Sequence, residues 1–373
     1  MKIVHVGEWN PHSGGGYNAM KNLLDSICKL SSDFDVHVVS FANKNLTIKE
    51  NNLTVHYLYN KNKSSLFHTY FFESKVLKKK IEELMPDIIH LHFTIPPYSF
   101  LCTLDIPVVI TTHGLSSIRI KGSHAIKSYF SLRYFLDRYY ERKALEKCTK
   151  IIAVSKWIQH QIEGIITQKS KIVHIPNGIN FMEYSSNNKI GNLNHPSIFF
   201  IGRLVKFKGV DILINSLLSI KKVYPTIHLY VAGEGPQYKN LISLVLKNNL
   251  SSNVTFMGYI DNKTKIKMFT SCDVFVIPSR YETFGIVVLE ALASGIPVVG
   301  SRTGGISEIL ADNTYGLLFN PFDSDDLAHK VCKLLNDDYL MDYYKHQGTV
   351  RANQFLWDDV AKDVLNLYSE LDK

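Results

Sequence analysis

Cysteine is scarce in this chain, and the cysteines that occur are far apart in the sequence. There are five, at Cys28, Cys102, Cys148, Cys272 and Cys332. An odd number without any C-x-x-C pair argues against a disulfide framework or a zinc cage and is typical of a reducing compartment. Long apolar runs are also missing. No segment approaches the roughly 18 apolar residues of a membrane span, and residues 1–7 lack the apolar core of a signal peptide, so we expect a cytosolic protein.

Acidic residues are in deficit, and the deficit is confined to the first half of the chain. The formal net charge is +8, but residues 1–190 hold 24 basic and 15 acidic side chains, whereas residues 191–373 hold 18 and 19. Ten basic residues and six Tyr or Phe lie between Arg119 and Lys156. This stretch is either a solvated helix with a packed aromatic face or a docking surface for an anionic membrane or a lipid-linked phosphate. Nucleic acid is disfavoured, because no nucleic-acid-binding motif accompanies the charge.

Predicted strands alternate with predicted helices through most of the chain. The strands are predicted at 3–6, 36–41, 55–58, 88–92, 108–112, 151–154, 172–175, 198–201, 227–232, 254–257, 274–277 and 298–299. The helices are predicted at 17–30, 67–85, 125–147, 209–223, 237–248, 263–271 and 285–293. Such alternation indicates βαβ units and parallel sheets covered on both faces. We therefore predict an α/β fold of two Rossmann-like domains, residues 1–184 and 197–354, joined by a polar linker over 185–196 and facing each other across an interdomain cleft.

Three glycines, Gly14 to Gly16, lie between the first predicted strand and its helix. Such a turn lets the backbone approach an anion such as phosphate, although an ordinary flexible turn explains the glycines alone equally well. The turn lacks the Lys-Ser/Thr of a P-loop and the G-x-G-x-x-G spacing of a dinucleotide site, which disfavours NAD. Asp33-Phe34-Asp35 has the D-x-D spacing of metal-dependent sugar transferases, but just before a strand a solvated turn is the simpler interpretation. We therefore predict no metal requirement.

The second predicted domain carries charged residues near the ends of its strands. Arg203 and Lys208 follow strand 198–201, and a guanidinium group with a nearby ammonium group suits a pyrophosphate. Either residue alone would be explained as a solvated loop cation. Glu282 lies in a loop after a strand, and Glu290 stands alone on a helix that is otherwise apolar. Because burial of an unpartnered carboxylate costs several kcal/mol, Glu290 should accept hydrogen bonds, either from a structural donor or from ligand hydroxyls such as those of a ribose.

The ordered set of motifs resembles the retaining glycosyltransferases of family 4 (glycosyl transferases group 1), which have the GT-B fold. Glu282 and Glu290 reproduce the E-x7-E signature of that family. The remaining motifs follow the family's order over nearly the whole chain: the glycine-rich first loop, Thr111-Thr112-His113-Gly114, Ala153-Val154-Ser155, Pro176-Asn177-Gly178, Gly202-Arg203-Leu204, Lys208-Gly209, Ala232-Gly233-Glu234-Gly235-Pro236, Phe256-Met257-Gly258 and Ser301-Arg302-Thr303-Gly304-Gly305. Each motif is weak alone, whereas their ordered spacing is specific. The chain departs from the family pattern at Arg280-Tyr281, since the third residue of the family's P-S-x-x-E-x-F-G motif is usually apolar or small.

The resemblance implies a role for each matching residue. Arg203 and Lys208 would hold the donor diphosphate, with Gly15 and Gly16 closing on it from the other domain. Glu290 would bind the ribose hydroxyls of the nucleotide. The resemblance also implies that residues 355–373 form a final helix that packs back on the first domain.

The sugar and the base would be held by further residues in the same family pattern. Glu282 would bind the sugar together with the backbone amides of Thr283, Phe284 and Gly285. Gly258 would lie near the base. His113 would reach the sugar or the acceptor from the first domain, although a histidine at a strand end is otherwise a structural hydrogen-bonding group.

The resemblance implies an enzyme that transfers a sugar with retention from a nucleotide sugar, by family frequency a UDP-sugar. The acceptor would be a glycan or a polyprenyl-diphosphate-linked molecule in cell-surface polysaccharide synthesis, such as that of lipopolysaccharide. We expect no cofactor and no metal, and a cytoplasmic enzyme at the inner face of the membrane. The alternative is a non-catalytic sugar-nucleotide-binding subunit of a glycosylation complex.

Overall fold

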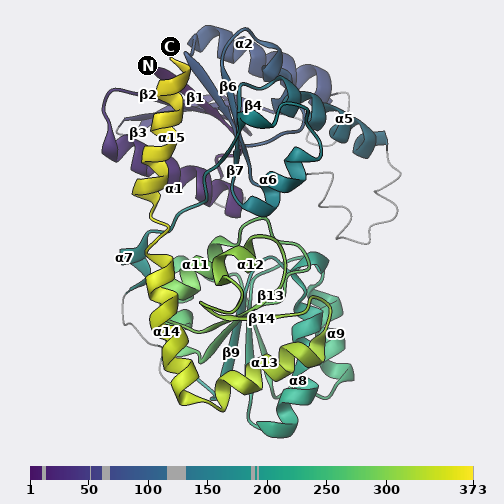
Figure 1. Ribbon diagram of the computed structural model, residues 1–373. Coiled ribbons are helices and arrows are strands. Elements are labelled where there is room, and N and C mark those ends of the chain that lie inside the picture. The colour runs from purple at the N-terminus through teal and green to yellow at the C-terminus, as the bar shows by residue number, and fades with distance from the viewer. Residues whose placement is uncertain are drawn as a thin grey trace. The chain divides into compact units, whose positions relative to one another are not determined.

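The computed structural model describes residues 1–10, 14–50, 52–60, 68–115, 132–185, 190 and 193–372. The chain forms two compact units, each described here by itself (Figure 1). Unit 1 comprises Met1–Gly178 and Trp357–Lys373, and unit 2 comprises Ile179–Leu356. Part of the basic stretch from Arg119 to Lys156 lies outside the described residues, which include this stretch only from Leu132 onward.

Unit 1 is built on a sheet whose described strands follow the order β3-β4-β2-β1-β5-β6-β7-β8. Their bounds are β1 (Lys2–Val6), β2 (Asp35–Ala42), β3 (Leu46–Glu50), β4 (Leu53–Tyr59), β5 (Ile88–Leu91), β6 (Val108–Thr112), β7 (Lys150–Ala153) and β8 (Ile172–His174). The sheet is parallel except at its edge, where β3 pairs antiparallel with β4. The prediction of a wholly parallel sheet is therefore wrong there. The connection from β3 to β4 is far too short for the crossover of a dozen or more residues that parallel pairing needs.

Helices cover both faces of the unit 1 sheet. They are α1 (Gly15–Leu30), the π-helix η2 (His68–Glu73), α2 (Ser74–Leu84), the 3-10 turns η3 (Tyr98–Thr103) and η4 (Lys169–Lys171), α5 (Leu132–Lys147), α6 (Lys156–Glu163) and α15 (Trp357–Leu371). The C-terminal helix α15 returns to unit 1 and packs against α1 (Figure 1). Because successive strand residues face opposite sides, Val4 and Val6 of β1 pack with side chains of α2, α5 and α6. His5, between them, instead contacts Tyr368 of α15.

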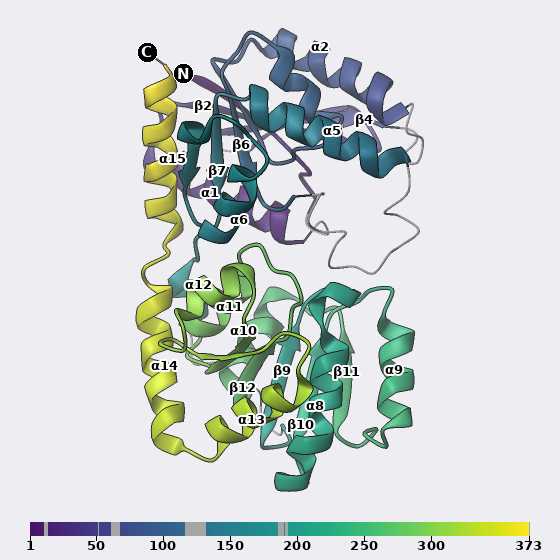
Figure 2. The ribbon, with the colours of Figure 1, turned by 45° about the vertical axis from the view of Figure 1, so that its right-hand side comes forward.

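Unit 2 has a parallel sheet in the strand order β11-β10-β9-β12-β13-β14. The strands are β9 (Ser197–Ile201), β10 (His228–Ala232), β11 (Val254–Gly258), β12 (Val274–Ile277), β13 (Val298–Ser301) and β14 (Leu317–Phe319). Its helices are α7 (Phe181–Tyr184), the 3-10 turn η5 (Lys206–Lys208), α8 (Val210–Val223), α9 (Tyr238–Lys247), α10 (Asn262–Ser271), α11 (Ile286–Ala293), α12 (Gly304–Leu310), α13 (Ser324–Leu335) and α14 (Asp338–Ala352). Apolar residues of α8, α9 and α13 form one core with β9, β10 and β12 (Figure 2).

The boundary between the units differs from the prediction of domains 1–184 and 197–354 with a linker over 185–196. The chain passes from unit 1 to unit 2 after Gly178 and returns after Leu356. Residues 179–184 belong to unit 2 because Tyr184 is buried there and its hydroxyl donates a hydrogen bond to Glu290. A polar composition marks a solvated loop, and such a loop can lie inside a unit as well as between two units.

Candidate active site

The charged side chains predicted for unit 2 lie on loops after neighbouring strands. Arg203 and Lys208 follow β9, and Glu282 follows β12, which pairs with β9 in parallel. The carboxyl ends of parallel strands meet at one edge of the sheet, which is where open α/β sheets bind ligands. The sequence therefore predicted correctly which edge of this sheet collects the charge.

An ion pair joins two of the predicted catalytic residues. The Lys208 Nζ atom lies 2.6 Å from Glu282 Oε2, and the two side chains are 20% and 14% exposed. Arg203 is exposed and forms no ion pair with any residue in the described part of the chain. At this edge of the sheet the charge of Lys208 is therefore balanced by Glu282, whereas Arg203 is open to solvent.

Two glycines allow close backbone contacts in the loops that carry Lys208 and Glu282. Gly209 has φ +70°, and a Cβ atom there would lie 1.9 Å from the carbonyl oxygen of Pro278. Gly304 has φ +46°, and a Cβ atom there would lie 1.8 Å from the carbonyl oxygen of Glu282. Only glycine combines a left-handed φ with such close approach. Both sides of the Lys208–Glu282 pair are therefore held by neighbouring backbone.

Arg280, where the chain departs from the family pattern, links the loop after β12 to the segment that follows β9. Its guanidinium donates two hydrogen bonds of 2.8 Å each to the carboxylate of Asp211. Its backbone N–H donates to the carbonyl of Phe207 at 2.7 Å, within the turn that carries Lys208. The sequence contains no local signal for this contact, since Arg280 and Asp211 are 69 residues apart.

Glu290 is buried on α11 and has two structural donors. The Tyr184 hydroxyl donates to Oε1 at 2.9 Å, and the Lys265 ammonium group donates to the same oxygen at 2.8 Å. Burial and, after it, the Glu290 charge hold the pKa of Tyr184 well above its usual range, so the hydroxyl remains a donor. The prediction that Glu290 is hydrogen-bonded is confirmed, with structural donors as its partners. Neither Lys265 nor Tyr184 was predicted, because both meet Glu290 only through the fold.

Helix α11 begins one residue later than predicted, and the sugar-binding role of the Thr283, Phe284 and Gly285 amides stays a prediction. The helix begins at Ile286, and Gly285 is its N-cap residue with φ 96°. The N–H groups of the first helical turn are therefore those that follow Gly285, while Thr283, Phe284 and Gly285 lie before the helix. Because Gly285 has a left-handed backbone conformation, the helix begins only at the next residue. Phe284 itself is buried against Phe355.

Gly258 ends β11 beside the Ala232–Pro236 loop. It has φ +67°, and its carbonyl accepts a hydrogen bond of 2.7 Å from the backbone N–H of Gly233. The structure thereby places the predicted base-side loop next to another motif of the family pattern.

In unit 1, the glycine turn opens α1. Among the residues that the structure describes, a Cβ atom at Gly14, Gly15 or Gly16 would meet nothing within 4 Å, and Gly14 has φ +82°. Contacts with the described residues therefore do not require glycine at positions 15 and 16, and their role in ligand binding stays a prediction. Asp33 and Asp35 are both exposed.

His113 follows β6 and lies in a largely apolar environment. Its Nε2 atom is 3.1 Å from Nδ1 of His92, and burial lowers the pKa of His113 to about 4. A small cavity of about 20 Å³ is lined by His92, Thr111, His113 and Asn177 among others. His113 is therefore a neutral imidazole at physiological pH, able to donate or to accept a hydrogen bond.

Two solved structures show the class of fold. The sucrose-phosphate synthase of Thermosynechococcus elongatus superimposes with a TM-score of 0.86 at 21% identity, covering 100% of this chain and 99% of that one. HepE of Anabaena, in complex with UDP and glucose, superimposes with a TM-score of 0.80 at 19% identity, covering 99% and 100%. At these identities the likeness establishes the fold alone. Two α/β domains, each built on a largely parallel sheet, form the GT-B fold of glycosyltransferases, as the sequence predicted.

The family follows from the sequence comparisons. Residues 13–182 match the family described as Glycosyltransferase Family 4, and residues 184–351 match Glycosyl transferases group 1. An uncharacterized glycosyltransferase of Methanocaldococcus jannaschii is 30% identical over 382 residues, covering 100% of this chain and 99% of the relative. The chain therefore belongs to the group 1 glycosyltransferases of family 4 and is a transferase. Among the helices described, none is long and apolar enough to cross a membrane.

Proposed function

We propose that this glycosyltransferase transfers a sugar, with retention, from a UDP-sugar to a glycan or lipid-linked acceptor in cell-surface polysaccharide synthesis. The observation that carries the proposal is the Lys208–Glu282 ion pair, 2.6 Å long and held on both sides by backbone contacts at Gly209 and Gly304. The choice of UDP is supported by HepE, which has the same fold and binds UDP and glucose.

In the proposed reaction, the bond between the sugar C1 and the diphosphate oxygen breaks while C1 bonds to the acceptor oxygen on the same face. The proton of the acceptor hydroxyl passes to an oxygen of the leaving diphosphate. Lys208 and Arg203 neutralise the charge that grows on this diphosphate. In the free protein Glu282 balances Lys208, and with donor bound Glu282 accepts hydrogen bonds from the sugar hydroxyls. No metal ion takes part in this scheme.

The nucleotide half of the donor would contact the other predicted residues. Both structural donors of Glu290 reach Oε1, and Oε2 is the oxygen we assign to the ribose hydroxyls. Gly258 would face the base, while Gly15 and Gly16 would approach the diphosphate and His113 the sugar or acceptor. The fixed position of the Glu290 carboxylate means that ribose binding needs no reorganisation of this side chain.

Alanine substitution of the two cations tests the proposal. Loss of one such donor typically lowers the rate by about 10²- to 10³-fold, and we expect this for Lys208→Ala and Arg203→Ala with a panel of nucleotide sugars. Lys206→Ala is a matched control, because Lys206 is an exposed cation in the same short turn. Glu282→Gln should also be severely impaired. Near-normal turnover of the Lys208 and Arg203 variants would refute the assignment.

The same panel separates the enzyme from the alternative, a non-catalytic binding subunit. Thermal stabilisation by a nucleotide sugar without turnover on any acceptor would favour the subunit. Slow hydrolysis of one nucleotide sugar would support the transferase. Activity abolished by a chelator and restored by manganese would contradict metal independence.

We further propose that unit 1 docks on an anionic membrane through α5 and η2. Five large apolar side chains are more than half exposed there: Phe71, Phe72, Leu132, Phe135 and Tyr139. The two elements are joined, since the Tyr70 hydroxyl donates to Asp137 Oδ1 at 2.8 Å. Helix α5 also carries exposed cations, at Arg133, Arg138, Arg142, Lys143 and Lys147. Aromatic side chains with basic neighbours suit an acidic headgroup region, where each cation adds about 1 kcal/mol of binding.

Vesicle sedimentation tests this surface. The full chain should bind vesicles that contain phosphatidylglycerol, less in high salt, and bind weakly to phosphatidylcholine alone. Phe135→Ser and Arg142→Gln should each reduce binding, whereas Lys239→Gln, on the exposed side of α9 in unit 2, should not. Equal binding to both vesicle types, or none, would overturn membrane docking without affecting the transfer reaction.

A further inference from the structure

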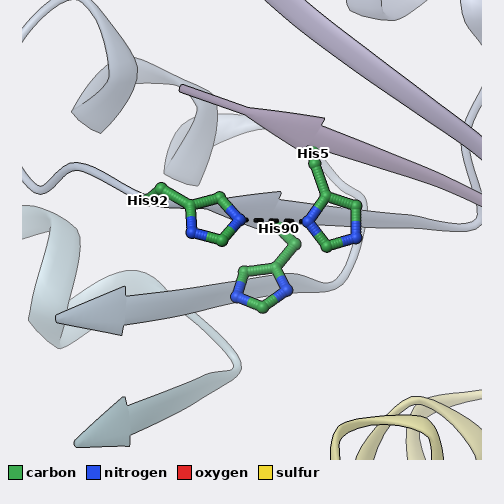
Figure 3. A group of neighbouring side chains, drawn as sticks. All are labelled: His5, His90 and His92. Carbon is green, nitrogen blue, oxygen red and sulfur yellow. Dashed lines mark hydrogen bonds between the residues drawn. The ribbon is translucent and has the colours of Figure 1, made fainter. Parts of the chain in front are cut away.

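Unit 1 contains a buried row of histidines that the proposed transfer reaction does not use. His5 on β1 and His90 on β5 are paired in register, and His92 follows β5. All three are buried, and Figure 3 shows them grouped, with a dashed line between His5 and His92. With three further residues they form what we call the histidine chain, which runs in the order Thr111, His90, Tyr368, His5, His92 and His113.

One arm of the histidine chain leads from Tyr368 to His113. The Tyr368 hydroxyl lies 3.3 Å from His5 Nε2. His5 Nδ1 lies 3.0 Å from His92 Nε2, the contact drawn as a dashed line in Figure 3. His92 Nδ1 lies 3.1 Å from His113 Nε2. A hydroxyl on the C-terminal helix is therefore linked to the candidate active-site histidine through two buried imidazoles.

The other arm leads from Tyr368 to Thr111. The Tyr368 hydroxyl is hydrogen-bonded to His90 Nδ1, and His90 Nε2 lies 2.6 Å from Thr111 Oγ1. The Tyr368 hydroxyl thus contacts a histidine of each arm. Since it has a single proton, it can donate to only one of them, and when it does so it accepts from the other.

The contacts of the three rings favour this hydrogen-bonded chain over a metal site. The ligand atoms of His5, His90 and His92 lie within 4.8 Å of one another, as a metal ion would require. However, all six nitrogen atoms of these rings already face a hydrogen-bonding partner in the chain, so a metal ion would have to displace these contacts. Burial lowers the pKa of His5 to about 3, and burial with neighbouring histidines holds the pKa values of His90 and His92 well below the usual range. Each ring is therefore neutral, with one N–H donor and one acceptor nitrogen.

Counting these protons leaves two arrangements in which every contact of the chain has one donor and the Tyr368 proton has an acceptor. In the first, all four histidines carry their proton on Nε2, and Tyr368 donates to His90 and accepts from His5. In the second, all four carry it on Nδ1, and Tyr368 donates to His5 and accepts from His90. If His90 carries its proton on Nδ1 and the other three carry theirs on Nε2, Tyr368 accepts twice and its own proton has no acceptor among these residues. Every other mixed arrangement places two donors or two acceptors against each other.

We propose that Tyr368 and Thr111 are positioning residues that lock the four histidines into one common tautomer, so that the nitrogen of His113 that carries its proton is tied to the tautomer of the other three rings. The consequence for transfer rests on the role proposed above for His113. The lock itself concerns the free protein and does not depend on that role.

Nitrogen-15 spectra of histidine-labelled protein, which distinguish the two tautomers directly, test the lock at neutral pH. In the wild type all four histidines should show the same tautomer, and a mixture would overturn the proposal. In Tyr368→Phe, either common tautomer would leave a buried N–H group without an acceptor. His90 should therefore carry its proton on Nε2, toward Thr111, and the other three on Nδ1. Persistence of a common tautomer in this variant would also overturn the proposal.

Thr111→Val provides a second test if Tyr368→Phe does not fold. It removes the acceptor of a proton on His90 Nε2, so all four histidines, including His113, should carry their proton on Nδ1. Thr112→Val is the matched control, because the buried Thr112 hydroxyl donates to the carbonyl of Ile152 instead. An Nε2 proton on His113 in Thr111→Val would contradict the lock. Turnover of this variant tests separately whether His113 acts in transfer.

Discussion

Acid should destabilise unit 1 far more than unit 2, because unit 1 buries neutral histidines. His5, His90 and His92 have folded-state pKa values far below the ordinary value of 6.5, with burial as the first cause. Above pH 6.5 these rings are neutral in both the folded and unfolded states, so they contribute no pH dependence. As the pH falls below 6.5 the unfolded chain binds protons that the folded unit cannot bind, and the free energy of unfolding decreases.

The expected loss follows from the size of this proton imbalance. Each such histidine costs about 1.4 kcal/mol per pH unit below 6.5, or about 2 kcal/mol at pH 5. Three of them give about 6 kcal/mol, against a typical total stability of about 5–15 kcal/mol. His56 and His113, whose pKa values burial lowers to about 4, add to the loss in the same unit. In unit 2, His228 is a buried histidine with a lowered pKa, so the loss there should be about 2 kcal/mol or less.

Urea unfolding followed by tryptophan fluorescence measures this loss in unit 1 alone. The three tryptophans of the chain, Trp9, Trp157 and Trp357, all belong to unit 1. The free energy of unfolding should fall by about 6 kcal/mol or more between pH 7.5 and pH 5. Hydrogen exchange of β9 and β12, corrected for the intrinsic pH dependence of exchange, follows unit 2 as an internal control. A fall of less than about 2 kcal/mol in unit 1 would refute the inference that these imidazoles stay neutral in the folded protein.

Three substitutions in unit 2 test the geometry of the candidate site. Gly304→Ala should lower kcat/KM and the melting temperature together, because its Cβ atom would lie 1.8 Å from the Glu282 carbonyl. Glu290→Gln should lower the free energy of unfolding by about 3–5 kcal/mol in a urea titration, because it leaves the ammonium group of Lys265 without its carboxylate. Arg280→Lys keeps the charge but loses the two-bond contact with Asp211, and should lower the free energy of unfolding by about 1.5–3 kcal/mol in the same titration. Wild-type values in any of these assays would contradict the corresponding contact.

The sequence singled out the residues of the candidate site only where a motif is local. The E-x7-E spacing located Glu282 and Glu290, and the residues after strand 198–201 located Arg203 and Lys208. Strand and helix alternation predicted both sheets, because hydrophobic patterning is a short-range property. It did not predict the antiparallel edge strand β3, nor that unit 2 begins at Ile179. These depend on loop length and on which unit buries a given side chain.

By itself, the sequence determined the family, the fold class and the residue types that the site offers. The tertiary structure alone decided how those residues are paired. Tyr184 meets Glu290 across 106 positions of the chain, and Tyr368 meets His90 across 278. Contacts of this kind leave no periodic or local signal, because they form only when parallel strands align and distant helices cover them. For the same reason the net charge of +8 can be counted from the sequence. The pairing of Lys208 with Glu282 and of Lys265 with Glu290 can be seen only in the fold.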